Sequence, residues 1–273
     1  MPHARISRRG SSTKQRMSRR DSPPEGPWSA YLDGFHASHP GITERVLSRC
    51  RADGLDPYEW VSEALAGDDL VLDLASGSAP LAATDPRRGW VAIDRSRSEL
   101  AFASQRLPGR VVQADARSMP VRDRVIDAVA ASMALMAVPS AERVLGEIER
   151  VLRADGILVA LLPATRPLRS QDRMRYARLL SAIRRVRLPF AEANMVRAPE
   201  RALTASGFRV VELLHKRFTF RLADADDADA FADSLYLPGS LAGRRHAVRA
   251  VVRSWRGKAL AVPLQRVIAV RHA

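Results

Sequence analysis

Residues 71–80 read VLDLASGSAP, and the organisation of the chain can be followed outward from this stretch. Its first residues are apolar except for Asp73, which is typical of a buried strand, and the small residues that follow predict a tight turn whose backbone approaches a ligand closely. A dinucleotide-binding turn would carry glycines in the order G-x-G-x-x-G. Here only Gly77 is present and a carboxylate precedes it. The stretch therefore favours a nucleotide-like ligand that carries positive charge.

Strands and helices alternate regularly after this stretch. Such alternation predicts a parallel sheet with helices on both faces. A further helix is expected at residues 200–206, a turn rich in acids at 224–233 and a basic helix at about 241–255. The expected strands are residues 71–74, 90–94, 111–114, 125–132, 157–162, 209–221 and 259–271.

The helix before the fifth strand carries the clearest signals. Ser140 is a candidate N-cap, and Gly156 is expected to end the helix. A single apolar stripe along this helix predicts that one face is buried. The stripe consists of Val144, Leu145, Ile148, Val151 and Leu152.

The N-terminal part divides into a tail and a helical segment. Residues 1–27 contain seven basic residues, two acids and almost no apolar side chains, which predicts disorder. This tail could be merely solvated, a nucleic-acid-binding arm or an organelle transit peptide. Residues 28–70 are expected to form three helices that pack over the sheet as a lid, the third beginning at Asp56-Pro57.

The composition is that of a folded, strongly basic protein. Apolar residues make up 46% of the chain, the net charge is +14, and only three of the 44 basic residues are lysines. The excess of bases could serve an anionic partner or solubility alone. It is concentrated in residues 165–200, a basic cap insertion with nine arginines and three acids. No apolar run approaches the roughly 18 residues of a membrane span. Cys50 is the single cysteine, so no internal disulfide can form, and we expect a cytoplasmic protein.

Three further stretches complete the pattern: VAIDRS at 91–96, QADARSMPVRDRVIDAV at 113–129 and VLRADGILVALLP at 151–163. Together with VLDLASGSAP they resemble the class I S-adenosyl-L-methionine-dependent methyltransferases, and among these the small-molecule enzymes called type 11. The resemblance covers residues 71–164 well and the last two strands moderately. It implies an α/β, Rossmann-like fold whose doubly wound, seven-stranded sheet is mostly parallel with an antiparallel last strand, residues 71–273 forming the methyltransferase domain.

The resemblance also implies where S-adenosylmethionine binds. Asp73 would face its amino-acid end, Asp94 would accept both ribose hydroxyls, and Asp115 would accept the adenine amino group. The implied cofactor-binding residues are Asp73, Ala75, Ser76, Gly77, Asp94, Arg95, Asp115, Ala116, Ser132 and Met133. The family usually has glycine where this chain has Ala75 and Ala79, and Ala79 is therefore expected to require a φ below zero.

The implied reaction is direct displacement of the methyl group, in which the enzyme mainly aligns acceptor atom, methyl carbon and sulfur. A general base is optional. No metal is implied, because Asp123 and Asp127 lie at the wrong end of the fourth strand. The candidates for a base are His36, His39, Tyr31 and Tyr176.

Three functions fit these patterns. The leading one is methylation of a small molecule bound between the N-terminal helices and residues 165–200. Two roles are open for the arginines of this insertion: contact with an acidic acceptor, or a solvated helix face. These arginines are Arg166, Arg169, Arg173 and Arg175. The second function is an RNA methyltransferase that uses the tail and insertion, although no recognised RNA module is present. The third is a cofactor-binding protein without catalysis. We expect no association with a membrane.

Overall fold

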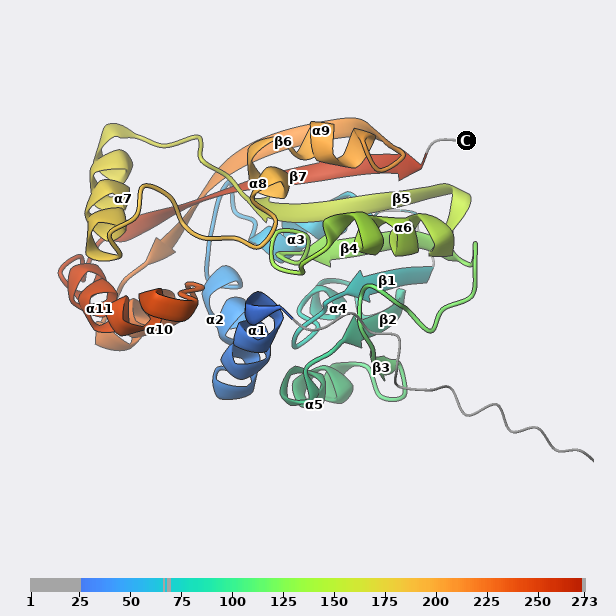
Figure 1. Ribbon diagram of the computed structural model, residues 1–273, viewed down its shortest axis with the longest axis horizontal. Helices are drawn as coiled ribbons and strands as arrows, with labels where there is room; N and C mark the ends of the chain where they lie inside the picture. The colour runs from blue at the N-terminus through green and yellow to red at the C-terminus, as the bar shows by residue number, and fades with distance from the viewer. Residues whose placement is uncertain (1–25, 66, 68–69, 272–273) are drawn as a thin grey trace, which may run out of the picture.

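A seven-stranded sheet in the order β3-β2-β1-β4-β5-β7-β6 forms the centre of the computed structural model, which describes residues 26–65, 67 and 70–271 (Figure 1). The five neighbouring strands β3, β2, β1, β4 and β5 are all parallel, and β7 runs antiparallel to both β5 and β6. The predicted mixed α/β sheet is confirmed. The strands are β1 Leu70–Leu74, β2 Gly89–Asp94, β3 Val111–Gln113, β4 Ile126–Ser132, β5 Leu152–Pro163, β6 Phe208–Arg221 and β7 Ala259–Arg271.

Helices lie on both faces of this sheet and beyond one of its ends (Figure 1). They are α1 Pro27–Ser38, α2 Ile42–Leu47, α3 Pro57–Glu63, α4 Leu81–Thr84, α5 Arg97–Arg106, α6 Ala141–Val151, α7 Ser170–Ala182, α8 Ala193–Arg197, α9 Pro199–Thr204, α10 Ala225–Asp233, the 3-10 helix η1 Gly239–Arg244 and α11 Arg245–Arg253.

Two hydrophobic cores result from the alternation of side chains along the strands. Val71 belongs to the core that includes residues of α3, α4 and α5, whereas Leu72 belongs to the core that includes α6 and α9. Successive strand residues point to opposite faces, so a strand buried on both faces needs continuous apolar character. The carboxylate of Asp73 is therefore an exception in a strand that is otherwise apolar.

The carboxyl ends of the parallel strands face α1 and α2, with α7, α10 and α11 further out at the left of Figure 1. The helices of this end contact one another, α2 with α10 and α11 with α7 and α10. Ligands of open parallel sheets bind at this edge. A ligand site is therefore expected at the loops that follow β1, β2 and β4.

Two expectations about the C-terminal third are corrected by the structure. The acidic turn expected at 224–233 is helix α10, because the Asp224 carboxylate caps it by accepting the Asp227 N–H at 2.9 Å. The basic helix expected at about 241–255 is divided into η1 and α11.

Helix α6 begins where predicted, directly after Ser140, but the capping role of Ser140 and the predicted end at Gly156 are wrong. Ser140 has a φ of 67° and its side chain makes no capping bond; Glu192 Oε1 instead accepts the N–H groups of Ser140 and Ala141, at 2.8 and 3.2 Å. Gly156 lies within β5 rather than at the helix end. A Cβ there would lie 2.9 Å from Leu152 Cδ2 and 3.0 Å from the Asp127 carbonyl oxygen, so close packing explains this glycine.

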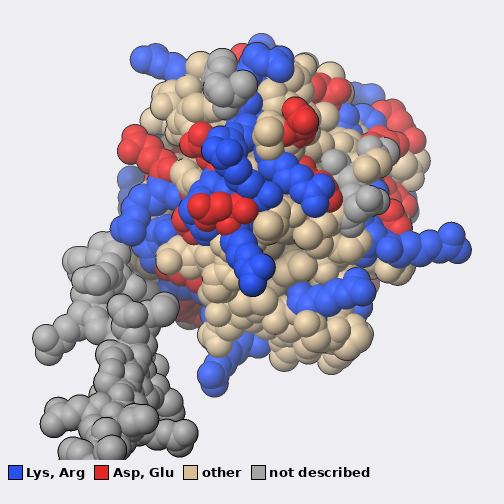
Figure 2. All heavy atoms as spheres, turned by 90° about the vertical axis from the view of Figure 1, so that its right-hand side faces the viewer, with Lys and Arg blue, Asp and Glu red and all other residues tan. Residues whose placement is uncertain are grey.

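Basic and acidic side chains are interleaved on the end of the molecule opposite the carboxyl ends of the parallel strands (Figure 2). Near the starts of β4 and β5, Arg150 pairs with Asp123 at 2.6 Å and Arg153 pairs with Asp127. Much of the positive charge on this face is therefore balanced locally. Residues 1–25 of the predicted tail lie outside the described residues. Within the described part of the chain, no helix has the length and apolar character needed to cross a membrane.

Candidate active site

The turn after β1 is left-handed at three positions. Ala75, Gly77 and Ala79 have φ values of 50°, 55° and 56°. The expectation that Ala79 requires a negative φ is therefore wrong. Each alanine in this region costs about 1–2 kcal/mol. The Ser76 N–H donates to the Ile93 carbonyl at 3.0 Å and thereby ties the turn to β2. The close turn is thus formed despite the alanines.

A cavity of about 100 Å³, here called the small cavity, lies at this turn. The ends of β1, β2 and β4 line it from below, and residues of α1 and α2 line it from the other side. Asp115 and Ala116 are not among its lining residues. The predicted cofactor-binding residues that do line it are Asp73, Ala75, Ser76, Gly77, Asp94, Arg95, Ser132 and Met133.

Three polar atoms in this lining have no hydrogen-bond partner among the described residues. They are Asp73 Oδ2, Ser76 Oγ and Ser132 Oγ, all fully buried. The Asp73 side chain is 1% exposed, and burial together with the neighbouring Asp94 raises its pKa well above the usual value. Buried polar groups are almost always paired. An unpaired carboxylate oxygen beside two unpaired hydroxyls fits a cationic ligand such as the amino-acid end of S-adenosylmethionine.

Asp94 and Asp115 are both engaged by neighbouring groups. Asp94 accepts the N–H groups of Gly77 and Ser96, each at 2.8 Å, and burial raises its pKa although these two bonds oppose the rise. Burial alone would raise the pKa of Asp115 too, but hydrogen bonds from Arg117 outweigh it and hold that pKa below its usual value. Asp94 therefore shapes the small cavity, whereas Asp115 is paired with Arg117 outside it.

The N-terminal helices are fastened to the small cavity by carboxylates. Glu99, in the first turn of α5 and 3% exposed, accepts from His36 Nδ1 at 2.9 Å and from the Gly41 N–H at 3.0 Å. Glu44 of α2 accepts from the Ser78 hydroxyl at 2.6 Å. Sequence reasoning missed both glutamates, because an acid in the first turn of a helix indicates only a favourable interaction with the helix dipole.

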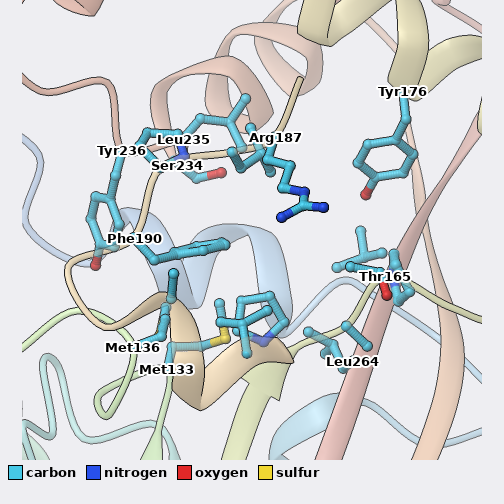
Figure 3. Close-up of a pocket in the computed structure, with 18 of the residues that line it drawn as sticks. Met133, Met136, Thr165, Tyr176, Arg187, Phe190, Ser234, Leu235, Tyr236 and Leu264 are labelled. Carbon is cyan, nitrogen blue, oxygen red and sulfur yellow. The ribbon is translucent and has the colours of Figure 1, made fainter. Parts of the chain in front are cut away.

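A second cavity of about 730 Å³, here called the large cavity, adjoins the small one. Thr43, Met133 and Tyr236 line both cavities and form the seam between them. Residues of α7, α8, β7 and the loop before α8 supply most of its remaining wall, which is largely apolar. Figure 3 shows these side chains converging on an open space. Its size is within the usual range for small-molecule sites.

The four candidate bases are not brought together. His36 lines the small cavity, and its Nε2 lies 3.4 Å from the hydroxyl of Tyr236, a residue that sequence reasoning missed. Tyr176 lines the large cavity but donates to the Ala261 carbonyl at 2.9 Å. The Tyr31 hydroxyl accepts the Leu237 N–H at 2.7 Å, and His39 lines a separate cavity beside α10. His36 is therefore the best placed of the four. Among the residues that the structure describes, no group of three His, Cys, Asp or Glu side chains could hold a metal ion.

Two curated relatives of known activity resemble this chain. The demethylmenaquinone methyltransferase of Thermobifida fusca is 33% identical over 142 residues, or 47% of this chain, and the match spans only 60% of that relative. The malonyl-[acyl-carrier protein] O-methyltransferase of Geobacter sulfurreducens is 30% identical over 190 residues, 68% of each chain. The methyltransferase domain family matches residues 72–160, which contain the turn and β1 to β5 almost entirely.

Solved structures share the fold at low sequence identity. The [4+2]-cyclase SpnF has a TM-score of 0.56 at 20% identity, covering 92% of this chain and 98% of its own. The YcgJ protein of Bacillus subtilis has a TM-score of 0.51 at 14% identity, covering 79% and 98%. The cofactor of the matched family is S-adenosyl-L-methionine, in agreement with the unpaired carboxylate and hydroxyls of the small cavity. Sequence, fold and relatives agree that this chain belongs to the class I S-adenosyl-L-methionine-dependent methyltransferases.

Proposed function

We propose that this chain transfers the methyl group of S-adenosylmethionine to a small molecule held in the large cavity. The observation that carries the proposal is the seam, where Thr43, Met133 and Tyr236 border both cavities. An acceptor in the large cavity and a methyl donor in the small one would meet there. The two curated relatives are named for demethylmenaquinone and for malonyl-[acyl-carrier protein], and these names support a small acceptor group.

The residues of the small cavity have distinct tasks in this proposal. The cofactor supplies an activated methyl group on a positively charged sulfur. Asp73, with Ser76 and Ser132, would hold the polar end of the cofactor, and Asp94 would hold the ribose. Alignment of acceptor and methyl carbon can contribute about 7–11 kcal/mol in favourable cases. His36, hydrogen-bonded through Nδ1 to Glu99, would accept a proton that the acceptor loses at the seam.

The domain organisation follows from the same proposal. Residues 28–70 would act as a lid over the cofactor, and residues 165–200 as a cap over the acceptor. None of Arg166, Arg169, Arg173 and Arg175 lines the large cavity, although Thr165 and Leu168 do. Contact between the acceptor and those four arginines is therefore not part of the proposal.

The experiment is a methyl-transfer assay with the full chain and S-adenosylmethionine that carries a tritiated methyl group. Separate reactions contain a demethylmenaquinone, a malonyl thioester, a protein-free metabolite extract and an RNA pool. We expect label in a small molecule and none in RNA. Asp94→Ala should weaken binding of S-adenosylhomocysteine by about 1–3 kcal/mol, measured by calorimetry, since it removes hydrogen bonds to a charged group.

Other outcomes would decide between the remaining functions. Label in RNA that is lost when residues 1–25 are deleted, together with RNA binding that falls steeply with salt, would establish the nucleic-acid alternative. Binding of S-adenosylhomocysteine without label in any acceptor pool would favour a non-catalytic protein. An Asp94→Ala variant with unchanged affinity would contradict the assignment of the cofactor to the small cavity.

A further inference from the structure

All charged side chains that line the large cavity are positive. Its charged lining residues are Arg187 and Arg197, and no aspartate or glutamate belongs to the lining. Figure 3 shows the Arg187 guanidinium pointing into the cavity. Among the described residues, none forms a hydrogen bond or an ion pair with Arg187. Every other lining side chain is uncharged, and most are aliphatic or aromatic, such as Phe190 and Leu264. Arg187, an exposed residue, therefore presents an uncompensated cation to an apolar space.

This arrangement selects among ligands on physical grounds. A guanidinium binds a carboxylate through two parallel hydrogen bonds, and such charge-assisted bonds are about twice as strong as those between neutral groups. A cationic ligand would be repelled, and a neutral apolar ligand would gain no charge-assisted bond from the guanidinium. A strongly polar polyanion would leave the apolar wall in contact with charge. An apolar body with one anionic group satisfies both the wall and the arginine.

We propose that the acceptor is an amphipathic anion, an apolar chain or ring system that carries a carboxylate bound by Arg187. This inference rests on the proposed function and specifies its acceptor. Arg187 lines only the large cavity, whereas Met133 and Tyr236 lie at the seam with the small cavity. The carboxylate is thus an anchor, and the atom that receives the methyl group is a different part of the molecule. Arg187 determines specificity and takes no part in the chemical step.

The test uses dodecanoate and dodecan-1-ol as probes, because they have the same chain and differ in charge. Their affinities are measured by displacement of the fluorescent dye 1-anilinonaphthalene-8-sulfonate from the full chain at 150 mM salt. The variant is Arg187→Met, which keeps much of the apolar stem and removes the charge. The matched control is Arg185→Met, in the same loop but outside the cavity lining. Calorimetry with S-adenosylhomocysteine on all three proteins reports folding and the cofactor site.

We expect the wild type to bind dodecanoate about tenfold more tightly than dodecan-1-ol. Arg187→Met should lose this preference while its affinity for dodecan-1-ol stays unchanged, and Arg185→Met should behave as the wild type. Equal affinities for the two probes, no binding of either, or equal losses in both variants would each overturn the proposal. If S-adenosylhomocysteine still binds in that case, the methyltransferase function stands and only the acceptor class is wrong.

Discussion

At the scale of single residues, Asp73 is held where its charge is unfavourable. It is 1% exposed, one of its oxygens has no partner among the described residues, and burial raises its pKa well above the usual value. A carboxyl group whose pKa is raised by folding lowers stability as pH rises above its unfolded value of about 3.9. The penalty is absent below that pH and grows until the pKa of the folded state is reached. A bound cation would relieve it.

Asp73→Asn should therefore stabilise the free protein and weaken its cofactor site. We expect a gain of about 2 kcal/mol in the free energy of unfolding at pH 8, the size of an uncompensated buried group, and a smaller gain at pH 5. Urea denaturation at both pH values measures the gain, and calorimetry measures the loss of S-adenosylhomocysteine affinity. Asp155→Asn, at an exposed carboxylate, serves as control. A loss of stability that is the same at both pH values would show that Asp73 is not strained.

Ala75 is a second residue under strain, with a φ of 50° where glycine is usual in the family. Removing its Cβ relieves about 1–2 kcal/mol, and the greater freedom of glycine in the unfolded chain takes back about 0.4–1 kcal/mol. Ala75→Gly should therefore raise the unfolding free energy by up to about 1.6 kcal/mol. Ala101→Gly, at an exposed interior position of α5, should lower it by about 1 kcal/mol. Thermal unfolding compares the two, and equal losses would rule out strain at Ala75.

At the scale of elements, α1 and α2 close the small cavity. Its volume of about 100 Å³ is below the several hundred Å³ of ordinary small-molecule sites. In the proposed function, a ligand as large as the cofactor would therefore enter by outward movement of these helices. The contacts that resist this motion are polar. Glu44 accepts from the Ser78 hydroxyl and, at 2.7 and 2.9 Å, from Arg106, while Glu99 accepts from His36 and Gly41. The proposed lid is thus held by a few charge-assisted bonds.

Glu44→Gln should make the lid easier to open. Partly exposed ion pairs contribute about 0.2–1 kcal/mol, so the association rate of S-adenosylhomocysteine should rise by up to about fivefold. Stopped-flow tryptophan fluorescence measures this rate, and Trp28 of α1 lies on the moving helix. The control, Glu142→Gln, changes an acid in the first turn of α6. An association rate equal to that of the control would show that opening of α2 does not limit binding.

At the scale of the whole molecule, the sheet could be predicted because its evidence is local. Apolar strands alternate with helical segments, and every predicted strand is present within a few residues of its expected bounds. Helix ends were less predictable. Ser140 has the right residue type for a cap, but Glu192, 52 residues away, occupies that role. Gly156 has the right type for a helix end, yet it is needed where β5 passes close to the Asp127 carbonyl.

The sequence by itself determined the parallel strands and the strand-end acids Asp73 and Asp94, because chain order fixes which residues end each strand. It indicated the cofactor through the resemblance of these motifs to a known family. The tertiary structure alone decided what faces those acids. It brings His36 against both Glu99 and Tyr236, which is 200 residues distant, and it turns Arg187 toward the large cavity. These contacts depend on how helices pack across the edge of the sheet. Packing between segments that are distant in the chain leaves no periodic pattern in the sequence of either segment.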